Sequence, residues 1–170
     1  MKTPSYIEFH NETHMVLSRI LKEAEPEEGC AILIGKKKIS AKNNKQICWE
    51  IIHIWKCANI WGDKKSKLIK QDATISINPE DIRYSKINRF EIDAQDQIKA
   101  QKWSRKHSLE VLCFAHSHPL SDNRPSEIDL FWHQSPGLMI ISDKKGNLKA
   151  WWIKNKFTFH IVKIEVFSLT

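Results

Sequence analysis

The sequence predicts a single α/β domain over residues 1–170, with a mixed β-sheet flanked by helices. Three observations lead to this fold class. A chain of 170 residues suits one domain with one sizeable core. Short apolar or alternating runs of strand length are separated by segments with helical spacing of apolar residues. The sequence contains no internal repeats, low-complexity tracts or linker-like stretches.

Seven short segments with apolar or alternating side chains predict β-strands. In chain order they are residues 6–9, 29–37, 48–58, 110–115, 138–142, 148–154 and 157–167. The first is short and alternates, so we expect it at an edge of the sheet. The second is a continuous apolar run ending in lysines, as in a buried strand. Residues 36–46, rich in Lys and Asn, are expected to form the hairpin loop that follows.

Three segments predict helices, and each has a recognisable boundary. Residues 12–25 repeat apolar side chains at helical spacing until Pro26 ends the pattern. A second helix begins at Asp93, a good N-cap, and its thin apolar face places it on the surface. A third runs from Ser126 to a Pro-Gly pair that stops it. Residues 61–88 show no clear pattern beyond a turn-like Asn-Pro pair.

The composition narrows the classes of function. No apolar run approaches the ~20 residues needed to span a bilayer, and the polar N-terminus predicts no secretory signal. Four cysteines without CxxC spacing indicate reduced, buried thiols, so we expect a cytoplasmic protein without a membrane partner. A net charge of +7 would suit nucleic acid, but we expect a solvated basic face or a rim that meets an acidic protein.

Two histidines and an aspartate stand at metal-ligand spacing late in the chain. His116 and His118 follow a predicted buried strand and share one of its faces, so both can bind one metal. Ser126 and Asp129 have the spacing of a helix capping box, which would place Asp129 beside the end of that strand. Three such ligands leave a fourth tetrahedral position open, which is typical of a catalytic zinc site.

The segment HSHP at residues 116–119, with the later S-x-x-D, resembles the JAMM motif of the MPN metalloproteases, in particular their short prokaryotic JAB branch. Upstream, the stretch PEEGCAILIG at residues 26–35 resembles the family segment that carries a catalytic glutamate, which aligns Glu28 with it. Glu27 stays a rival for that role. The resemblance covers roughly residues 5–155 and implies the MPN/JAB fold, which is similar to cytidine deaminases.

This resemblance implies a zinc metallopeptidase, a deubiquitinase-like isopeptidase of the JAMM type, with one Zn²⁺ per chain held by His116, His118 and Asp129. It implies that Glu28 acts as the base and proton donor, and that Ser126 hydrogen-bonds the oxyanion. The implied substrate is a ubiquitin-like or sulfur-carrier protein with an extended C-terminal tail, and E1/E2-like enzymes are implied partners. Tail processing, deconjugation and cysteine release all stay open.

Other interpretations stay open as well. A RadC-like, DNA-associated protein shares the HxHP spacing and would suit the basic charge, although HSHPLS stands here where RadC sequences have HNHPSG. A non-catalytic MPN scaffold usually lacks zinc ligands that are all present here. Trp61 and Trp132 are candidates to line a peptide groove, and His133 is a candidate partner of a ligand. Ser117 should pack or cap on the opposite strand face.

Overall fold

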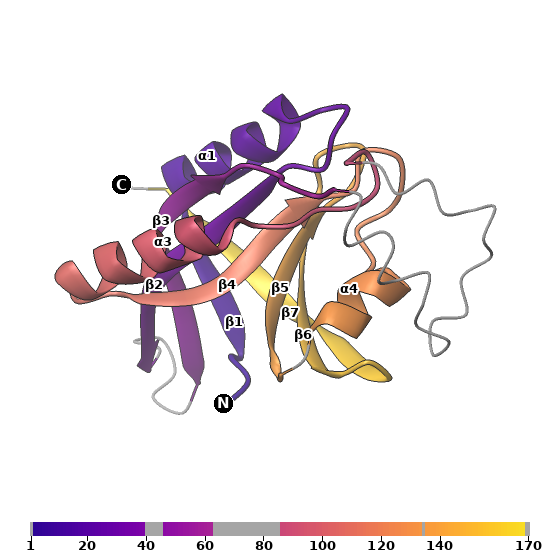
Figure 1. Cartoon of the computed structure of the whole chain (residues 1–170). Coiled ribbons are helices and arrows are strands. Elements are labelled where there is room, and N and C mark those ends of the chain that lie inside the picture. Colours follow the sequence, from indigo (N-terminus) through magenta and orange to yellow (C-terminus); the bar gives the residue numbers. More distant parts are fainter. Residues whose placement is uncertain (1, 40–45, 63–85, 134, 169–170) are drawn as a thin grey trace.

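The computed structural model describes residues 2–39, 46–62, 86–133 and 135–168. Its elements are, in chain order, β1 (Tyr6–His10), α1 (Asn11–Glu23), β2 (Cys30–Ile39), β3 (Ile47–Cys57), α3 (Ala94–Lys106), β4 (Glu110–Ser117), α4 (Glu127–Trp132), β5 (Gly137–Ser142), β6 (Leu148–Asn155) and β7 (Thr158–Phe167) (Figure 1). The predicted mixed α/β architecture is confirmed. That the whole chain forms one domain stays a prediction.

Two of the predicted segments fall partly outside the described residues. These are the hairpin loop, because residues 40–45 are not described, and the segment 61–88 with its turn-like Asn-Pro pair, because residues 63–85 are not described. The strand before the hairpin continues to Ile39, past the predicted end at residue 37.

The strands form one closed sheet in the order β1-β3-β2-β4-β5-β6-β7. The sheet is mixed because β1 pairs in parallel with β3 and β7, and β4 with β5, whereas the other neighbours are antiparallel. The prediction of an edge strand at residues 6–9 is therefore wrong. β1 joins the two ends of the sheet. It alternates because Ile7 and Phe9 are buried on one face while Glu8 and His10 are only partly buried on the other, and this pattern does not depend on whether a strand has one neighbour or two.

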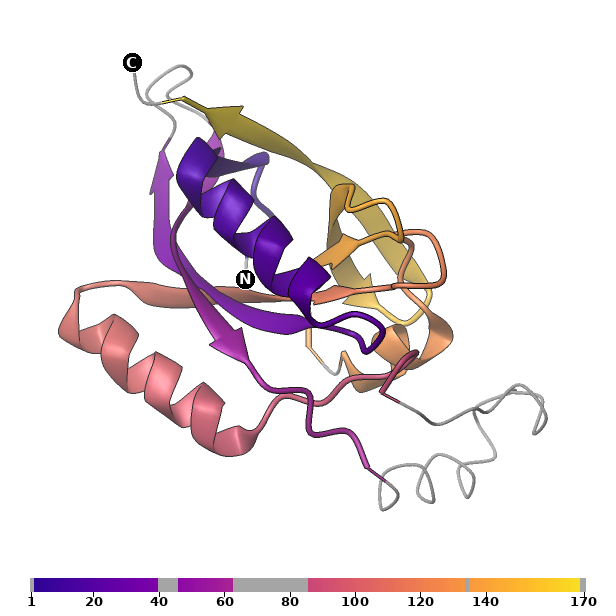
Figure 2. The same cartoon turned by 90° about the horizontal axis from the view of Figure 1, so that it is seen from above.

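Helices cover the curved sheet from both faces. The buried face of α1, with Leu17 and Leu21, packs in one core cluster with Leu33 of β2. The adjacent residue of β2, Ile32, points the other way and packs in a second cluster with Ala100 of α3. The two helices thus lie on either side of β2 (Figure 2). A third cluster on β5 and β6 receives Leu130 of α4.

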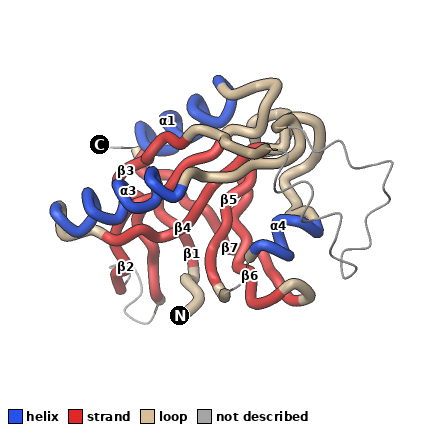
Figure 3. Tube along the Cα trace, in the orientation of Figure 1, coloured by secondary structure: helices blue, strands red, loops and turns tan. Residues whose placement is uncertain are grey.

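The loops that position the site meet at one end of the sheet (Figure 3). The loop before β2 bonds to the segment before α3, where Glu28 N–H donates to Lys86 O at 2.6 Å. The same loop bonds to the end of β4 through Ser117 and Gly29. Segments far apart in the chain are therefore hydrogen-bonded beside the histidines of β4.

The four cysteines are all buried and free, as the sequence predicts. Across the described ranges, the helices are too short and too polar for any of them to cross a membrane. The cytoplasmic location stays a prediction.

Candidate metal centre

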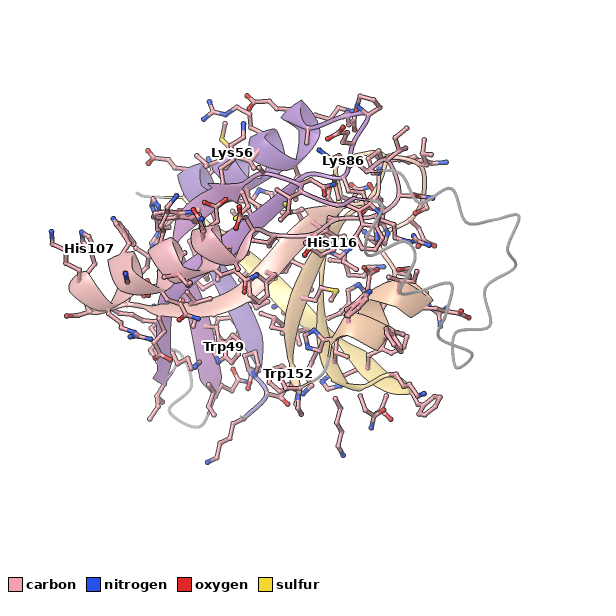
Figure 4. All side chains as sticks on the ribbon, viewed as in Figure 1. Trp49, Lys56, Lys86, His107, His116 and Trp152 are labelled. Carbon is pink, nitrogen blue, oxygen red and sulfur yellow. The ribbon has the colours of Figure 1, made fainter. Side chains whose placement is uncertain are left out.

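β4 brings two histidines to one point because its alternation continues past its last residue. Phe114 packs on the face of β4 that α3 covers, and His116 and His118 follow it at intervals of two. His116, labelled in Figure 4, is fully buried, and His118 is almost so. Their Nε2 atoms lie 3.0 Å apart. The two rings therefore converge through the same nitrogen, as two ligands of one ion would.

The start of α4 brings a carboxylate to the two rings. Ser126 is the N-cap: its Oγ accepts from the Asp129 N–H at 3.2 Å, and its own N–H donates to Asp129 Oδ2 at 2.7 Å. This capping box fixes the carboxylate of Asp129. Its Oδ1 lies 3.4 Å from Nε2 of His116, and its Oδ2 lies 3.4 Å from Nε2 of His118. The side chain of Asp129 thus belongs both to the cap of α4 and to the candidate metal cluster.

The donor set of this cluster fits a metal ion. The ligand atoms of His116, His118 and Asp129 all lie within 4.8 Å of one another, and the three side chains are buried. Nδ1 of His118 lies 2.8 Å from the carbonyl oxygen of Asp122, so it can donate there and leave Nε2 unprotonated. A cation among the three groups would accept lone pairs from both rings and the carboxylate at once.

The electrostatics of the cluster keep its carboxylate ionised. Burial lowers the pKa of His116. Burial opposes protonation of His118 too, but the hydrogen bond and charge of Asp129 outweigh it and raise the pKa of His118. Burial alone would raise the pKa of Asp129, but the two histidines hold it well below its usual range. Asp129 is therefore ionised at neutral pH, which places a negative charge at the centre of the cluster.

Glu28, on the loop before β2, lies beside the same cluster and is only 5% exposed. Burial raises its pKa from 4.5 to about 8; the charge of Asp129 adds to this effect, and His118 and Arg89 oppose it. A carboxyl group in this state exchanges its proton near neutral pH, which suits a proton-transfer group. The electrostatic coupling joins Glu28 to two of the three candidate ligands.

Glu27 points elsewhere. Its side chain is 47% exposed, and its carboxylate lies 3.9 Å from Nζ of Lys86. Of the two glutamates that the sequence left open, the structure brings Glu28 to the cluster. Ser117, on the opposite face of the strand, accepts from the Gly29 N–H at 2.8 Å and donates its own N–H to Gly29 O at 3.0 Å. It thereby caps the loop that carries Glu28, as the alternation predicts.

A cavity of about 490 Å³ opens beside Asp129. Its lining mixes apolar and polar side chains and includes both candidate groove residues, Trp61 and Trp132. Phe90 also lines it and stacks on the ring of His116, with centroids 4.3 Å apart. His133 lines the cavity as well, but among the described residues its Nε2 has no hydrogen-bond partner, so it does not orient a candidate ligand through that nitrogen.

Sequence reasoning missed three residues of this region: Asn59, Arg89 and Phe90. Arg89 and Phe90 line the cavity, and Asn59 is hydrogen-bonded to backbone groups around it. The signal for two of them was an Arg-Phe pair just before the N-cap of α3, a position where a side chain can reach the end of β4. Asn59 had no such signal, because its partners lie far from it in the chain.

Comparisons with known proteins agree with this geometry. The profile of the family described as prokaryotic homologs of the JAB domain matches residues 10–154. A desampylase of Pyrococcus furiosus is 35% identical over 78 residues, which are 45% of this chain and 56% of that protein. The aligned region therefore spans only a little over half of that relative's length.

Two structures solved in solution share the fold. One, of a protein from Desulfitobacterium hafniense, has a TM-score of 0.71 at 19% identity, covering 96% of this chain and 94% of the other. The second, of a protein from Salinibacter ruber, has a TM-score of 0.57 at 20% identity, covering 92% and 89%. At this level of identity the likeness speaks for the fold alone.

Proposed function

The chain belongs to the family of prokaryotic JAB-domain homologs, and from this premise we propose that it is a zinc-dependent peptidase or isopeptidase. Its substrate would be an amide bond after the C-terminal tail of a ubiquitin-like or sulfur-carrier protein. The observation that carries the proposal is the buried cluster of His116, His118 and Asp129 with Glu28 beside it. Similarity to a desampylase supports a protein modifier as the substrate. The same premise implies a cytidine-deaminase-like MPN/JAB arrangement.

Three residues would hold the zinc ion: His116 and His118 through Nε2, and Asp129 through its carboxylate. Three nitrogen and oxygen ligands are typical of catalytic zinc sites, whereas structural sites usually have four ligands, often cysteines. Bound there, zinc would polarise the scissile carbonyl and lower the pKa of a water molecule, so that hydroxide is available for attack near neutral pH.

Two residues would handle protons and charge. Glu28 would take a proton from the attacking water and then pass it to the departing amine nitrogen, a role that its pKa of about 8 supports. The Oγ atom of Ser126 accepts from the Asp129 N–H, so its own hydroxyl proton is free to be donated. Ser126 would donate it to the oxygen that becomes negative, a contact typically worth about 10² to 10³ in rate.

The cavity beside Asp129 would receive the substrate next to the scissile bond. The aromatic side chains in its lining, Trp61 and Trp132 among them, offer apolar contact to an extended tail. The protein bearing that tail, together with E1/E2-like enzymes, would be the partners. We do not propose a nucleic-acid partner. Lys37 and Lys38 form ion pairs at 2.7–3.2 Å with acidic side chains of neighbouring strands. They also lie at the opposite end of β2 from Cys30, which pairs with His116.

The first test measures zinc in the purified wild type and in the variant His118→Ala by elemental analysis. We expect about one zinc per chain in the wild type and none in the variant. His116→Ala and Asp129→Ala should behave in the same way. A wild type without zinc, even after reloading, would overturn the enzyme proposal and favour a scaffold.

The second test measures cleavage. Ubiquitin-like and sulfur-carrier proteins, extended by one amino acid or joined to a lysine side chain, are incubated with the enzyme, and the product masses are determined. Glu28→Gln should keep zinc and lose turnover, whereas Glu27→Gln should keep both. Activity in Glu28→Gln together with an inactive Glu27→Gln would reverse the assignment of the base.

A further inference from the structure

One amide side chain joins the loop that carries Glu28 to the wall of the cavity. Asn59 lies just beyond β3. Its Nδ2 donates to the carbonyl oxygens of Arg89 at 2.9 Å and Glu28 at 3.0 Å, and the carbonyl oxygen of Lys86 lies 3.4 Å from it. Its Oδ1 accepts from two backbone N–H groups, those of Trp61 at 3.0 Å and Glu91 at 3.2 Å. All of its amide hydrogen-bonding capacity is thus spent on the backbone.

The partners also determine how the amide is oriented. Every neighbour of Nδ2 is an acceptor and every neighbour of Oδ1 is a donor, so the opposite orientation would set donors against donors. An aspartate at position 59 would place an oxygen against three carbonyl oxygens. An alanine would leave the same backbone groups without their partner. The arrangement therefore requires asparagine in particular.

The backbone around Glu28 is held from every side. Its N–H donates to Lys86 O at 2.6 Å, and its carbonyl accepts from Asn59. The next residue, Gly29, exchanges two hydrogen bonds with Ser117. Next to Asn59, the Ile60 N–H donates to Glu91 O at 2.9 Å. Glu91 lines the cavity, so these hydrogen bonds extend from the Glu28 loop to the cavity wall. Asn59 is therefore one of the contacts that hold the loop of Glu28 against that wall, and it is the one that bonds to both.

We propose that Asn59 is a positioning residue that sets the distance between Glu28 and the cavity wall at residues 89–91. This inference rests on the proposed function, in which Glu28 moves protons and the cavity holds the substrate. Asn59 acts through Glu28 and not on the substrate itself. A displacement of a reacting group by about 1 Å can cost on the order of 10² in rate, so loosening this contact should lower kcat.

The test compares Asn59→Asp and Asn59→Ala with the wild type. Zinc content should not change, because the candidate ligands lie on β4, just after it and on α4. The value of kcat per bound zinc should fall by about 10² in both variants. In Asn59→Ala the amide hydrogens of Trp61 and Glu91 should also exchange faster. In Asn59→Asp they should stay protected, because the acceptor Oδ1 is kept.

Asn147→Ala is the matched control. Its side chain donates to Asp143 Oδ2 at 2.9 Å in the turn between β5 and β6. The control therefore also loses a hydrogen bond of a side-chain amide near the sheet. Its kcat per zinc should equal that of the wild type. If kcat per zinc in Asn59→Ala stays within about twofold of wild type while exchange rises, Asn59 only supports the fold and the proposal is overturned. Loss of zinc in Asn59→Asp would also overturn it.

Exchange at the Glu28 amide, followed in the same samples, requires no substrate. Faster exchange in Asn59→Asp is expected because Lys86 O, the acceptor of the Glu28 N–H, and Glu28 O would both face a carboxylate in place of an N–H donor. Unchanged exchange there would overturn the positioning role whether or not the enzyme is active. A wild type that binds zinc but cleaves no tail would instead count against the proposed function. The positioning role of Asn59 would still be decided by hydrogen exchange at the Glu28 amide.

Discussion

Replacing Glu28 by glutamine should stabilise the metal-free protein, and more so as the pH rises. Burial, together with Asp129, raises the pKa of Glu28 from 4.5 to about 8. Between these two pH values the folded chain keeps a proton that the unfolded chain has lost. The free energy of unfolding of the wild type therefore falls as the pH rises through this window. Glutamine fills the same space and cannot ionise, so its variant escapes that loss.

The magnitude follows from the width of the window. A span of about three and a half pH units, at about 1.4 kcal/mol per unit, corresponds to about 5 kcal/mol as an upper limit. Local relaxation around the buried charge reduces this value. We therefore expect Glu28→Gln to gain less than about 1 kcal/mol over wild type at pH 5, and about 2 to 5 kcal/mol at pH 8.5.

The assay is urea unfolding at pH 5, 7 and 8.5 in the presence of a chelator. Glu27→Gln serves as the control for removing a carboxylate from the same loop, because its side chain is half-exposed. A difference for Glu28→Gln that stays flat or shrinks as the pH rises would refute the reasoning. Loading with zinc should weaken the pH dependence, because a cation in the cluster would oppose the charge of Asp129.

Substitutions at three further positions test the local structure. Ser126→Ala should lower kcat by about 10² to 10³ and the free energy of unfolding by about 1 kcal/mol, measured by kinetics and urea unfolding; an unchanged rate would exclude Ser126 as the oxyanion donor. Ser117→Ala should cost about 1–3 kcal/mol in urea unfolding by leaving the buried Gly29 N–H without its acceptor, and Ser117→Thr should restore most of it. Gly35→Ala should cost more than about 4 kcal/mol or prevent folding, because its Cβ would lie 1.8 Å from the Glu50 carbonyl oxygen; a normal circular dichroism melt would contradict this.

Much of the fold and part of the site could be predicted because their signals are local. Pro26, Asp93 and Ser126 lie at or next to the helix boundaries. The capping box of α4 needs only the spacing between Ser126 and Asp129. The convergence of His116 and His118 needs only strand alternation. These signals depend on neighbours within one turn or one pleat, so the chain itself displays them.

The first strand was predicted at the right residues but at the wrong position in the sheet, because local signals do not show how many neighbours a strand has. A short alternating run looks the same whether it lies at an edge or between two strands. Closure of the sheet through β1 depends on strands that come much later in the chain, since Tyr6 pairs with both Cys48 and Lys163. No pattern within residues 6–9 could have shown these partners.

The sequence by itself determined the elements, the family resemblance and the set of residues that converge on the cluster. Only the tertiary structure places Glu28, rather than Glu27, beside the cluster, because the two side chains differ in burial and Glu28 is electrostatically coupled to Asp129. It alone shows the hydrogen bonds that Asn59 makes to backbone groups of distant segments. The reason is physical: both outcomes depend on contacts between segments separated by dozens of residues, which form only once the sheet has closed and its loops have met.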